Sequence, residues 1–141
     1  MRLGIVASRF NEEITGELLK QAREQARKLG IEFEEQSVPG ALEIPIALQW
    51  MAQSGRYDAL VAVGAVVRGD TYHFELVCNE SARGVMDVAL EFGLPIANGI
   101  LTTDDEAQAK ARLGKGAEAV RVAVEMCKMR NKLRAGGHED R

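Results

Sequence analysis

The stretch from Ala59 to Val67 constrains the fold more than any other part of the sequence. It is a nearly unbroken run of small and β-branched apolar residues, and the polar turn Arg68–Thr71 ends it. A strand that is apolar on both faces is typical of a parallel sheet covered by helices on both sides. We therefore expect a buried central strand with a polar turn at its carboxyl end.

A helix is expected directly after this turn, with Asp70 or Thr71 as its N-cap. The apolar positions that follow recur at helical spacing: Phe74, Val77, Cys78, Ala82, Val85, Met86 and Ala89. A helix start carries free backbone N–H groups and a partial positive charge. The turn is therefore a ready anion site.

His73 falls in the first turn of this helix. The positive helix end disfavours a protonated ring, which leaves a neutral imidazole able to exchange protons near neutral pH. The other histidine, His138, lies in a polar C-terminal segment that is expected to fray. His73 can also simply cap the helix or pack against it, so position alone leaves both interpretations open.

Strand and helix patterns alternate along the rest of the chain. Strand patterns occupy residues 3–7, 31–38, 59–67 and 96–101, the last interrupted by Asn98-Gly99. Apolar helix faces occupy residues 14–29, 44–51, 74–89 and 119–133, and a short helix ends near Arg112. Asn11 is the expected cap of the first helix, and a Thr-x-x-Glu capping box, Thr103–Glu106, is expected to start the short one.

This pattern predicts an α/β protein: a three-layer α/β/α sandwich with a four-stranded parallel sheet, of the flavodoxin-like type. A chain of 141 residues has the size of one domain, with residues 135–141 expected as a flexible tail. Ligands of such folds bind beyond the carboxyl ends of the strands. Aromatic and polar features are expected to converge at that edge: Phe10, Asn11, Gly40–Glu43, Arg68–His73 and Asn98.

Composition narrows the class of function. The net charge is −3 and no basic stripe is present, which argues against a nucleic-acid binder. Cys78 and Cys127 fall on apolar helix faces, as expected for reduced thiols rather than a disulfide or a metal site. No apolar run is long enough to span a membrane, and no secretory signal is visible. We expect a soluble cytoplasmic protein that acts on a small ligand.

Four motifs stand out along the chain. They are Ala-Ser-Arg-Phe-Asn at 7–11, Val-Pro-Gly-Ala-Leu-Glu-Ile-Pro at 38–45, Arg-Gly-Asp-Thr-x-His within 64–74, and Gly-Ile-Leu-Thr-Thr at 99–103 with Gln108-Ala109 and Arg112. Taken together and in this order, they resemble the motifs of the 6,7-dimethyl-8-ribityllumazine synthase family of riboflavin biosynthesis. The usual glycine-rich nucleotide-binding motifs are absent. The resemblance covers nearly the whole chain.

The resemblance implies a transferase that condenses 5-amino-6-(D-ribitylamino)uracil with 3,4-dihydroxy-2-butanone 4-phosphate. The reaction passes through an imine, releases phosphate and water, and closes the ring, with no metal and no organic cofactor. The resemblance also implies a homopentamer or a multiple of it, with the active site between subunits. In that arrangement Arg112 and His73 are contributed across from Phe10.

The resemblance also implies roles for individual residues. Phe10 stacks on the pyrimidine, Glu43 accepts hydrogen bonds from ribityl hydroxyls, and His73 moves protons. The full implied pyrimidine and ribityl pocket is Phe10, Asn11, Ala41, Leu42, Glu43, Ala65, Val66, Val67 and Asn98. The implied phosphate site is Asp70, Thr71 and Arg112, whose guanidinium fork matches a phosphate. Further candidates are Arg68, Lys115 and Glu118.

Three departures from the family pattern stand out. The sequence begins at its first core strand, the loop between Arg112 and Lys115 is shortened, and Leu42 replaces an aromatic residue. Two alternatives stay open: a riboflavin synthase of archaeal type and a non-catalytic shell or scaffold subunit that binds flavin-like rings. Retention of Arg112 with His73 and Glu43 favours catalysis. The sequence does not distinguish a pentamer from a decamer or a 60-subunit capsid.

Overall fold

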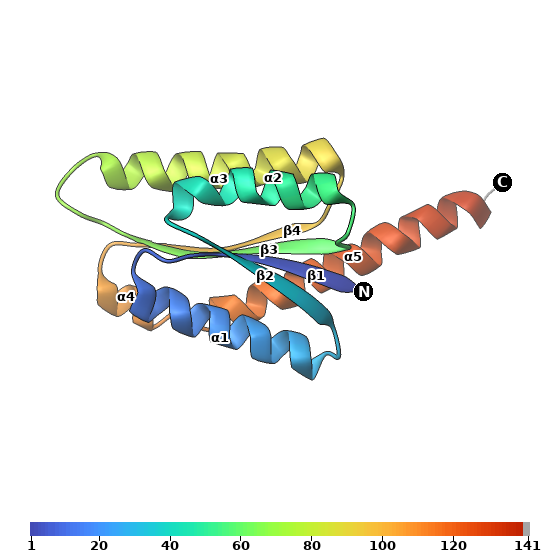
Figure 1. Cartoon of the computed structure of the whole chain (residues 1–141), viewed down its shortest axis with the longest axis horizontal. Helices are drawn as coiled ribbons and strands as arrows, with labels where there is room; N and C mark the ends of the chain where they lie inside the picture. Colours follow the sequence, from blue (N-terminus) through green and yellow to red (C-terminus); the bar gives the residue numbers. More distant parts are fainter. Residues whose placement is uncertain (140–141) are drawn as a thin grey trace.

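The computed structural model describes the backbone of residues 1–139 and the side chains of residues 1–136. Its centre is a four-stranded, all-parallel sheet with the strand order β2-β1-β3-β4 (Figure 1). The strands are β1 (Arg2–Ser8), β2 (Glu32–Val38), β3 (Ala59–Val67) and β4 (Ile96–Thr103). The predicted parallel sheet is confirmed.

Helices cover both faces of the sheet, as the apolar run in β3 requires. Figure 1 shows one layer above the sheet and one below it. The upper layer contains a short 3-10 turn, η1 (Ala41–Glu43), with α2 (Ile44–Ser54) and α3 (His73–Phe92). The lower layer contains α1 (Glu12–Lys28), α4 (Glu106–Lys110) and α5 (Lys115–Glu139). The arrangement is the expected α/β/α sandwich of flavodoxin-like type.

Strand β3 lies between two separate hydrophobic cores. Its side chains alternate, so that Val61 and Val63 pack with α1 and α5, while Leu60 and Ala62 pack with α2 and α3. All four side chains have no exposed surface. Full burial of a valine or leucine side chain stabilises a fold by roughly 1.5–3 kcal/mol. The central strand therefore fixes both helix layers.

The two edge strands differ in character. β2 pairs only with β1 and carries acidic residues, in agreement with its predicted edge position. β4 pairs only with β3 and continues without interruption to Thr103. The predicted break at Asn98-Gly99 is therefore wrong. The exposed Asn98 instead uses its side-chain oxygen to accept a hydrogen bond from the Ile100 N–H, 2.9 Å away.

The three predicted N-caps fared differently. Asn11 stands at the N-cap position of α1, as predicted, but its side chain makes no capping bond. Helix α3 has Tyr72 at the N-cap position, although the predicted Thr71 accepts the His73 N–H through its Oγ1 at 3.3 Å. Helix α4 is capped by Asp105, whose carboxylate accepts the Gln108 N–H at 2.8 Å. Thr103, the expected cap of α4, still belongs to β4.

Helix α5 continues to Glu139, through most of the segment expected as a tail. Its last turns stand away from the sheet (Figure 1). Residues 140 and 141, and the side chain of His138, lie outside the described part of the chain. No helix in that described part combines the length and apolarity needed to cross a bilayer.

Helix α5 crosses α1 at close range through Gly116. A Cβ atom at this position would fall onto the backbone carbonyl oxygen of Leu18. A backbone atom cannot move aside as a flexible side chain can. The crossing of α1 and α5 therefore depends on a residue without a side chain.

We expect Gly116→Ala to lower the free energy of unfolding by about 3 kcal/mol, because the two helices must separate to admit the methyl group. Thermal unfolding at a fixed protein concentration measures the effect. Gly16→Ala is the matched control, since Gly16 lies in α1 with no atom within 4 Å of the added carbon. Removal of a helical glycine should stabilise the control by about 0.5–1 kcal/mol. Equal stability of the two variants would contradict the proposed crossing.

Candidate active site

A cavity of about 610 Å³ lies beyond the carboxyl ends of β1, β2 and β3 and below the start of α3. We call it the His73 cavity. Its wall contains every residue implied for the pyrimidine and ribityl pocket except Asn98: Phe10, Asn11, Ala41, Leu42, Glu43, Ala65, Val66 and Val67. Thr71 and His73 also line it. The convergence of features from three strand ends is therefore observed within one chain.

Phe10 forms an open aromatic wall of this cavity. It follows β1 in a turn whose backbone is held to the end of β2, with the Phe10 N–H donating to the Pro39 carbonyl oxygen at 3.1 Å. The side chain is 72% exposed. A large aromatic ring left uncovered beside a cavity offers a stacking surface for a flat ligand.

Asn11 supports the wall by a contact that sequence reasoning missed. Its backbone has φ 62°, in the left-handed region that asparagine tolerates better than most residues. Its side-chain amide donates a hydrogen bond to the Ala65 carbonyl oxygen at 3.0 Å. This bond joins the turn after β1 to the end of β3, which explains why the side chain does not cap α1.

Glu43 places a carboxylate on the same wall. The 3-10 turn before α2 lets its Oε1 accept a hydrogen bond from the Gly40 N–H at 2.9 Å. An ionised carboxylate has about four lone-pair sites, so one backbone contact leaves capacity for several hydroxyl donors. The side chain is exposed, so a ligand in the cavity can reach it.

His73 is the first residue of α3, and its exposed ring lines the cavity. Its backbone N–H donates to the Thr71 Oγ1 at 3.3 Å. Phe10 and His73 thus face one cavity of one chain, whereas the family resemblance placed them across a subunit boundary. That expectation is wrong, because the turns after β1 and β3 meet at the ends of neighbouring strands.

A second cavity of about 740 Å³ lies beside the edge strand β4, and we call it the Arg112 cavity. Its lining includes four of the predicted residues: Asn98, Arg112, Lys115 and Glu118. The two cavities share no lining residue. Asn98 was expected at the heterocycle pocket but pairs with Ala62 in the middle of β3. Its position on the open edge, away from the strand ends, explains the difference.

The Arg112 cavity is rich in cations. The Arg112 Nη1 donates to the Gln108 carbonyl oxygen at 2.9 Å, and Lys115 forms a 3.5 Å ion pair with Glu118. Arg121 also lines the cavity and was not predicted, although its helical spacing of three from Glu118 places it on the same face. This cavity suits an anion, because three cationic side chains and only one carboxylate line it.

The predicted phosphate site is not assembled within one chain. Thr71 precedes α3 in the upper layer and lines the His73 cavity, while Arg112 follows α4 in the lower layer. Asp70 is exposed and lines neither cavity. The resemblance implied that these residues act together, and a single chain does not bring them together.

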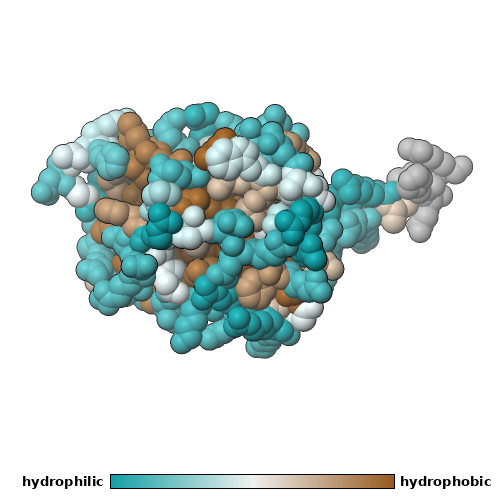
Figure 2. Space-filling model, viewed as in Figure 1, coloured by the Kyte–Doolittle hydropathy of each residue, from teal (hydrophilic) through white to brown (hydrophobic). Residues whose placement is uncertain are grey.

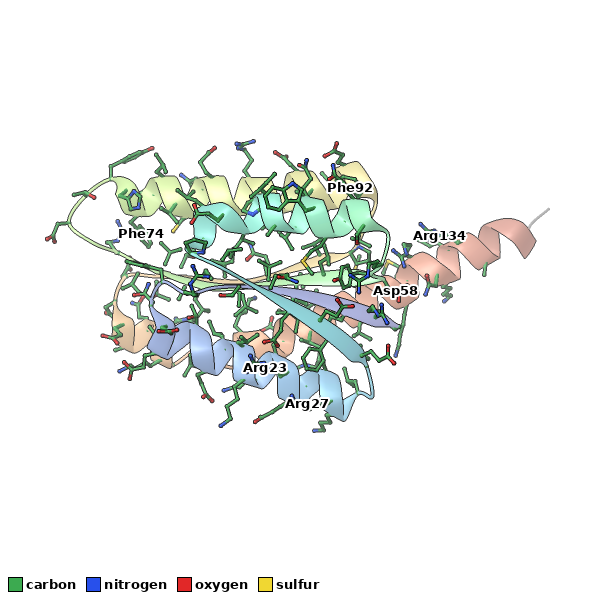
Figure 3. All side chains as sticks on the ribbon, viewed as in Figure 1. Arg23, Arg27, Asp58, Phe74, Phe92 and Arg134 are labelled. Atoms are coloured by element: carbon green, nitrogen blue, oxygen red, sulfur yellow. The ribbon has the colours of Figure 1, made fainter. Side chains whose placement is uncertain are left out.

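Arg68 lies in the loop between β3 and α3 and lines neither cavity. Its guanidinium binds two carboxylates, Glu75 and Asp104, and stacks over Phe74. Phe74, labelled in Figure 3, lies under the start of α3 and lines the His73 cavity. Hydrogen bonding to Arg68 holds the pKa of Glu75 below its usual value.

Other reactive groups lie away from both cavities. Cys78 is half-buried and Cys127 is buried, and both are free thiols. Burial raises the pKa of the Cys78 thiol, which favours its protonated form. Among the side chains that the structure describes, no three histidine, cysteine or acidic groups are placed to hold a metal ion.

Comparison with known proteins assigns the chain to a family. The family model of 6,7-dimethyl-8-ribityllumazine synthase matches residues 1–131. A protein of that name from Cupriavidus metallidurans is 54% identical over 99% of this chain and 87% of its own length. One from Cupriavidus pinatubonensis is 56% identical over 92% of this chain and 80% of its own length. One from Burkholderia vietnamiensis is 54% identical over 92% of this chain and 79% of its own length. The chain belongs to the 6,7-dimethyl-8-ribityllumazine synthase family.

Proposed function

We propose that the chain is a lumazine synthase, which condenses 5-amino-6-(D-ribitylamino)uracil with 3,4-dihydroxy-2-butanone 4-phosphate. One observation carries the proposal: the His73 cavity combines an exposed aromatic ring, an open carboxylate and a histidine at a helix start. These groups belong to the sequence motifs of the family. They match a substrate with a flat ring, a polyol chain and a centre that exchanges protons.

Binding of the pyrimidine substrate would use the strand ends. The ring would stack on Phe10 and lie against the ends of β1 and β3, which the Asn11–Ala65 hydrogen bond keeps in place. The ribityl chain would extend along the 3-10 turn, where Glu43 accepts its hydroxyl hydrogens. Orientation of both substrates in one site supplies much of the rate enhancement for a condensation.

The condensation then requires proton transfers at the carbon chain of the butanone phosphate. The 5-amino group of the uracil attacks the ketone, and loss of water gives an imine. His73 takes the proton from the carbon beside the imine as phosphate leaves the next carbon. The resulting enol becomes a ketone, and attack by the ribitylamino nitrogen closes the ring with loss of a second water. Arg112 would bind the phosphate and offset its charge as it leaves.

We further propose that the active site lies between subunits of a homopentamer, or a multiple of one, in the cytoplasm. The separation of the His73 and Arg112 cavities supports this proposal, because each cavity holds only part of the groups that the reaction needs. A ring satisfies the requirement if the Arg112 cavity of one subunit faces the His73 cavity of the next. Such a contact joins two different surfaces, and heterologous contacts of this kind form a ring when the rotation between neighbouring subunits closes.

Exposed apolar side chains also support assembly. A single chain leaves large hydrophobic residues open along α2, α3 and α5: Ile46, Trp50, Met86, Leu90, Met126, Met129 and Leu133. Figure 2 shows apolar side chains at the surface between polar ones on the face turned to the viewer. Contiguous exposed apolar surface is typical of a protein interface, which supports the proposed assembly.

The direct test mixes the purified protein with both substrates and follows lumazine absorbance together with released phosphate. We expect one phosphate for each lumazine formed. A riboflavin synthase would instead consume lumazine without releasing phosphate, and a scaffold subunit would bind the pyrimidine without turnover. Either result would reject the proposed activity.

Mixing variants tests whether the site is shared. We expect His73→Ala to lower kcat about 100-fold and Arg112→Ala to weaken chiefly the phosphate substrate, because each removes one contribution to the reaction. Coassembly of the two variants in equal amounts should restore about a quarter of the sites, since an intact His73 cavity then meets an intact Arg112 cavity.

The control is a mixture, in equal amounts, of two variant proteins, His73→Ala and Phe10→Ala. Both residues line the same cavity, so every His73 cavity in the mixture carries one lesion and activity should stay low. Size-exclusion chromatography with light scattering verifies that all variants assemble alike. If the His73 and Arg112 variants give only the average of their separate activities, the shared site is wrong.

A further inference from the structure

Arg68 makes an unusual set of contacts for an exposed side chain. Its Nε donates to the Asp104 Oδ1 at 2.8 Å, and its Nη1 donates to the Glu75 Oε1 at 2.7 Å. Its guanidinium carbon lies 4.4 Å from the centre of the Phe74 ring. The three partners come from two places in the chain: the first turn of α3 and the loop after β4.

These contacts occupy the guanidinium. Two edges of the planar group face carboxylates, and one of its faces covers the Phe74 ring. The two carboxylates already balance more than its charge. A bound phosphate would have to displace a carboxylate to gain the paired hydrogen bonds that make arginine an effective phosphate ligand. Arg68 is therefore a poor phosphate ligand, although the sequence made it a candidate for the site.

The same contacts act on the wall of the His73 cavity. Phe74 and Glu75 directly follow His73 in α3, and Phe74 itself lines the cavity. At the other end, the Arg68 N–H donates to the Thr103 carbonyl oxygen at 2.9 Å, which extends the pairing of β3 with β4. Arg68 thus ties the first turn of α3 to the end of the sheet across the loop that contains Asp70 and Thr71.

We propose that Arg68 is a positioning residue, which fixes the start of α3 and thereby holds the His73 ring at the substrate. The expected effect on kinetics rests on the proposed function. The role of Arg68 in holding the loop in place does not depend on any activity. Lowering of the Glu75 pKa by Arg68 fits this role. A lowered pKa favours the ionised carboxylate that this contact requires.

The chain offers a matched control in Arg83. Its guanidinium also binds two carboxylates, with Nη2 donating to Glu80 at 2.7 Å and Nη1 to Asp87 at 2.9 Å. All three residues belong to α3, so this arrangement joins nothing outside one helix. Arg83→Gln removes the same type of interaction without releasing a loop.

The experiment compares Arg68→Gln, Arg68→Lys and Arg83→Gln with the unaltered protein. Both Arg68 variants should lower kcat about tenfold or more and leave KM for the butanone phosphate within about twofold, because orientation at the reacting centre is lost while phosphate binding is kept. Lysine should fail as a substitute, since a single ammonium group cannot bind both carboxylates and cover the ring. Arg83→Gln should leave kcat and KM unchanged.

Amide hydrogen exchange gives a readout without turnover. Exchange in peptides covering residues 69–76 should become faster in both Arg68 variants and stay unchanged in Arg83→Gln. A rise in KM for the phosphate substrate at unchanged kcat would assign Arg68 to phosphate binding and overturn the proposal. Unchanged exchange of the loop would overturn it as well. If the unaltered protein makes no lumazine, the proposed function fails, and the exchange experiment still decides the role of Arg68.

Discussion

The burial of β3 on both faces is the constraint on which the rest of the structure depends. Because neither face tolerates water, helices must cover the sheet above and below, and only the two ends of the strands stay open. The parallel connections bring the turns after β1, β2 and β3 to the same end. The His73 cavity is thus a consequence of the sheet, and the hydrogen bond from Asn11 to Ala65 fixes the spacing of its two central turns.

The same two layers explain why one chain holds two separate cavities. The loop after β3 leads up into α3, whereas the loop after β4 leads down into α4 and α5. Groups that precede α3 and groups that follow α4 therefore lie on opposite sides of the sheet. If the reaction needs both sets, assembly is a requirement for catalysis as well as a source of stability, and activity becomes dependent on subunit concentration.

Periodicity and local motifs predicted the strands and the layers, because those features depend on residues close in sequence, and the family resemblance implied most of the His73 cavity. Two of the failures come from contacts between distant segments. Asn11 was expected to cap α1, but its amide bonds to a carbonyl group 54 residues away. Asn98 was assigned to the strand ends because the register of β4 against β3 is not visible in one sequence. The family resemblance predicted the residues of the site better than their distribution over two cavities.

The ion pairs of α3 show that similar contacts can have different consequences. Exposed pairs add little to stability, because solvent screens them and ordered side chains lose entropy. For Arg83, whose partners are three and four residues away, that small effect is all that the geometry provides. Arg68 instead joins groups separated by 36 residues and covers an aromatic ring of the cavity wall. The contribution of Arg68 is to restrict the motion of the loop before His73. A reaction rate that depends on orientation is sensitive to that motion, even where the free energy of unfolding is not sensitive to it.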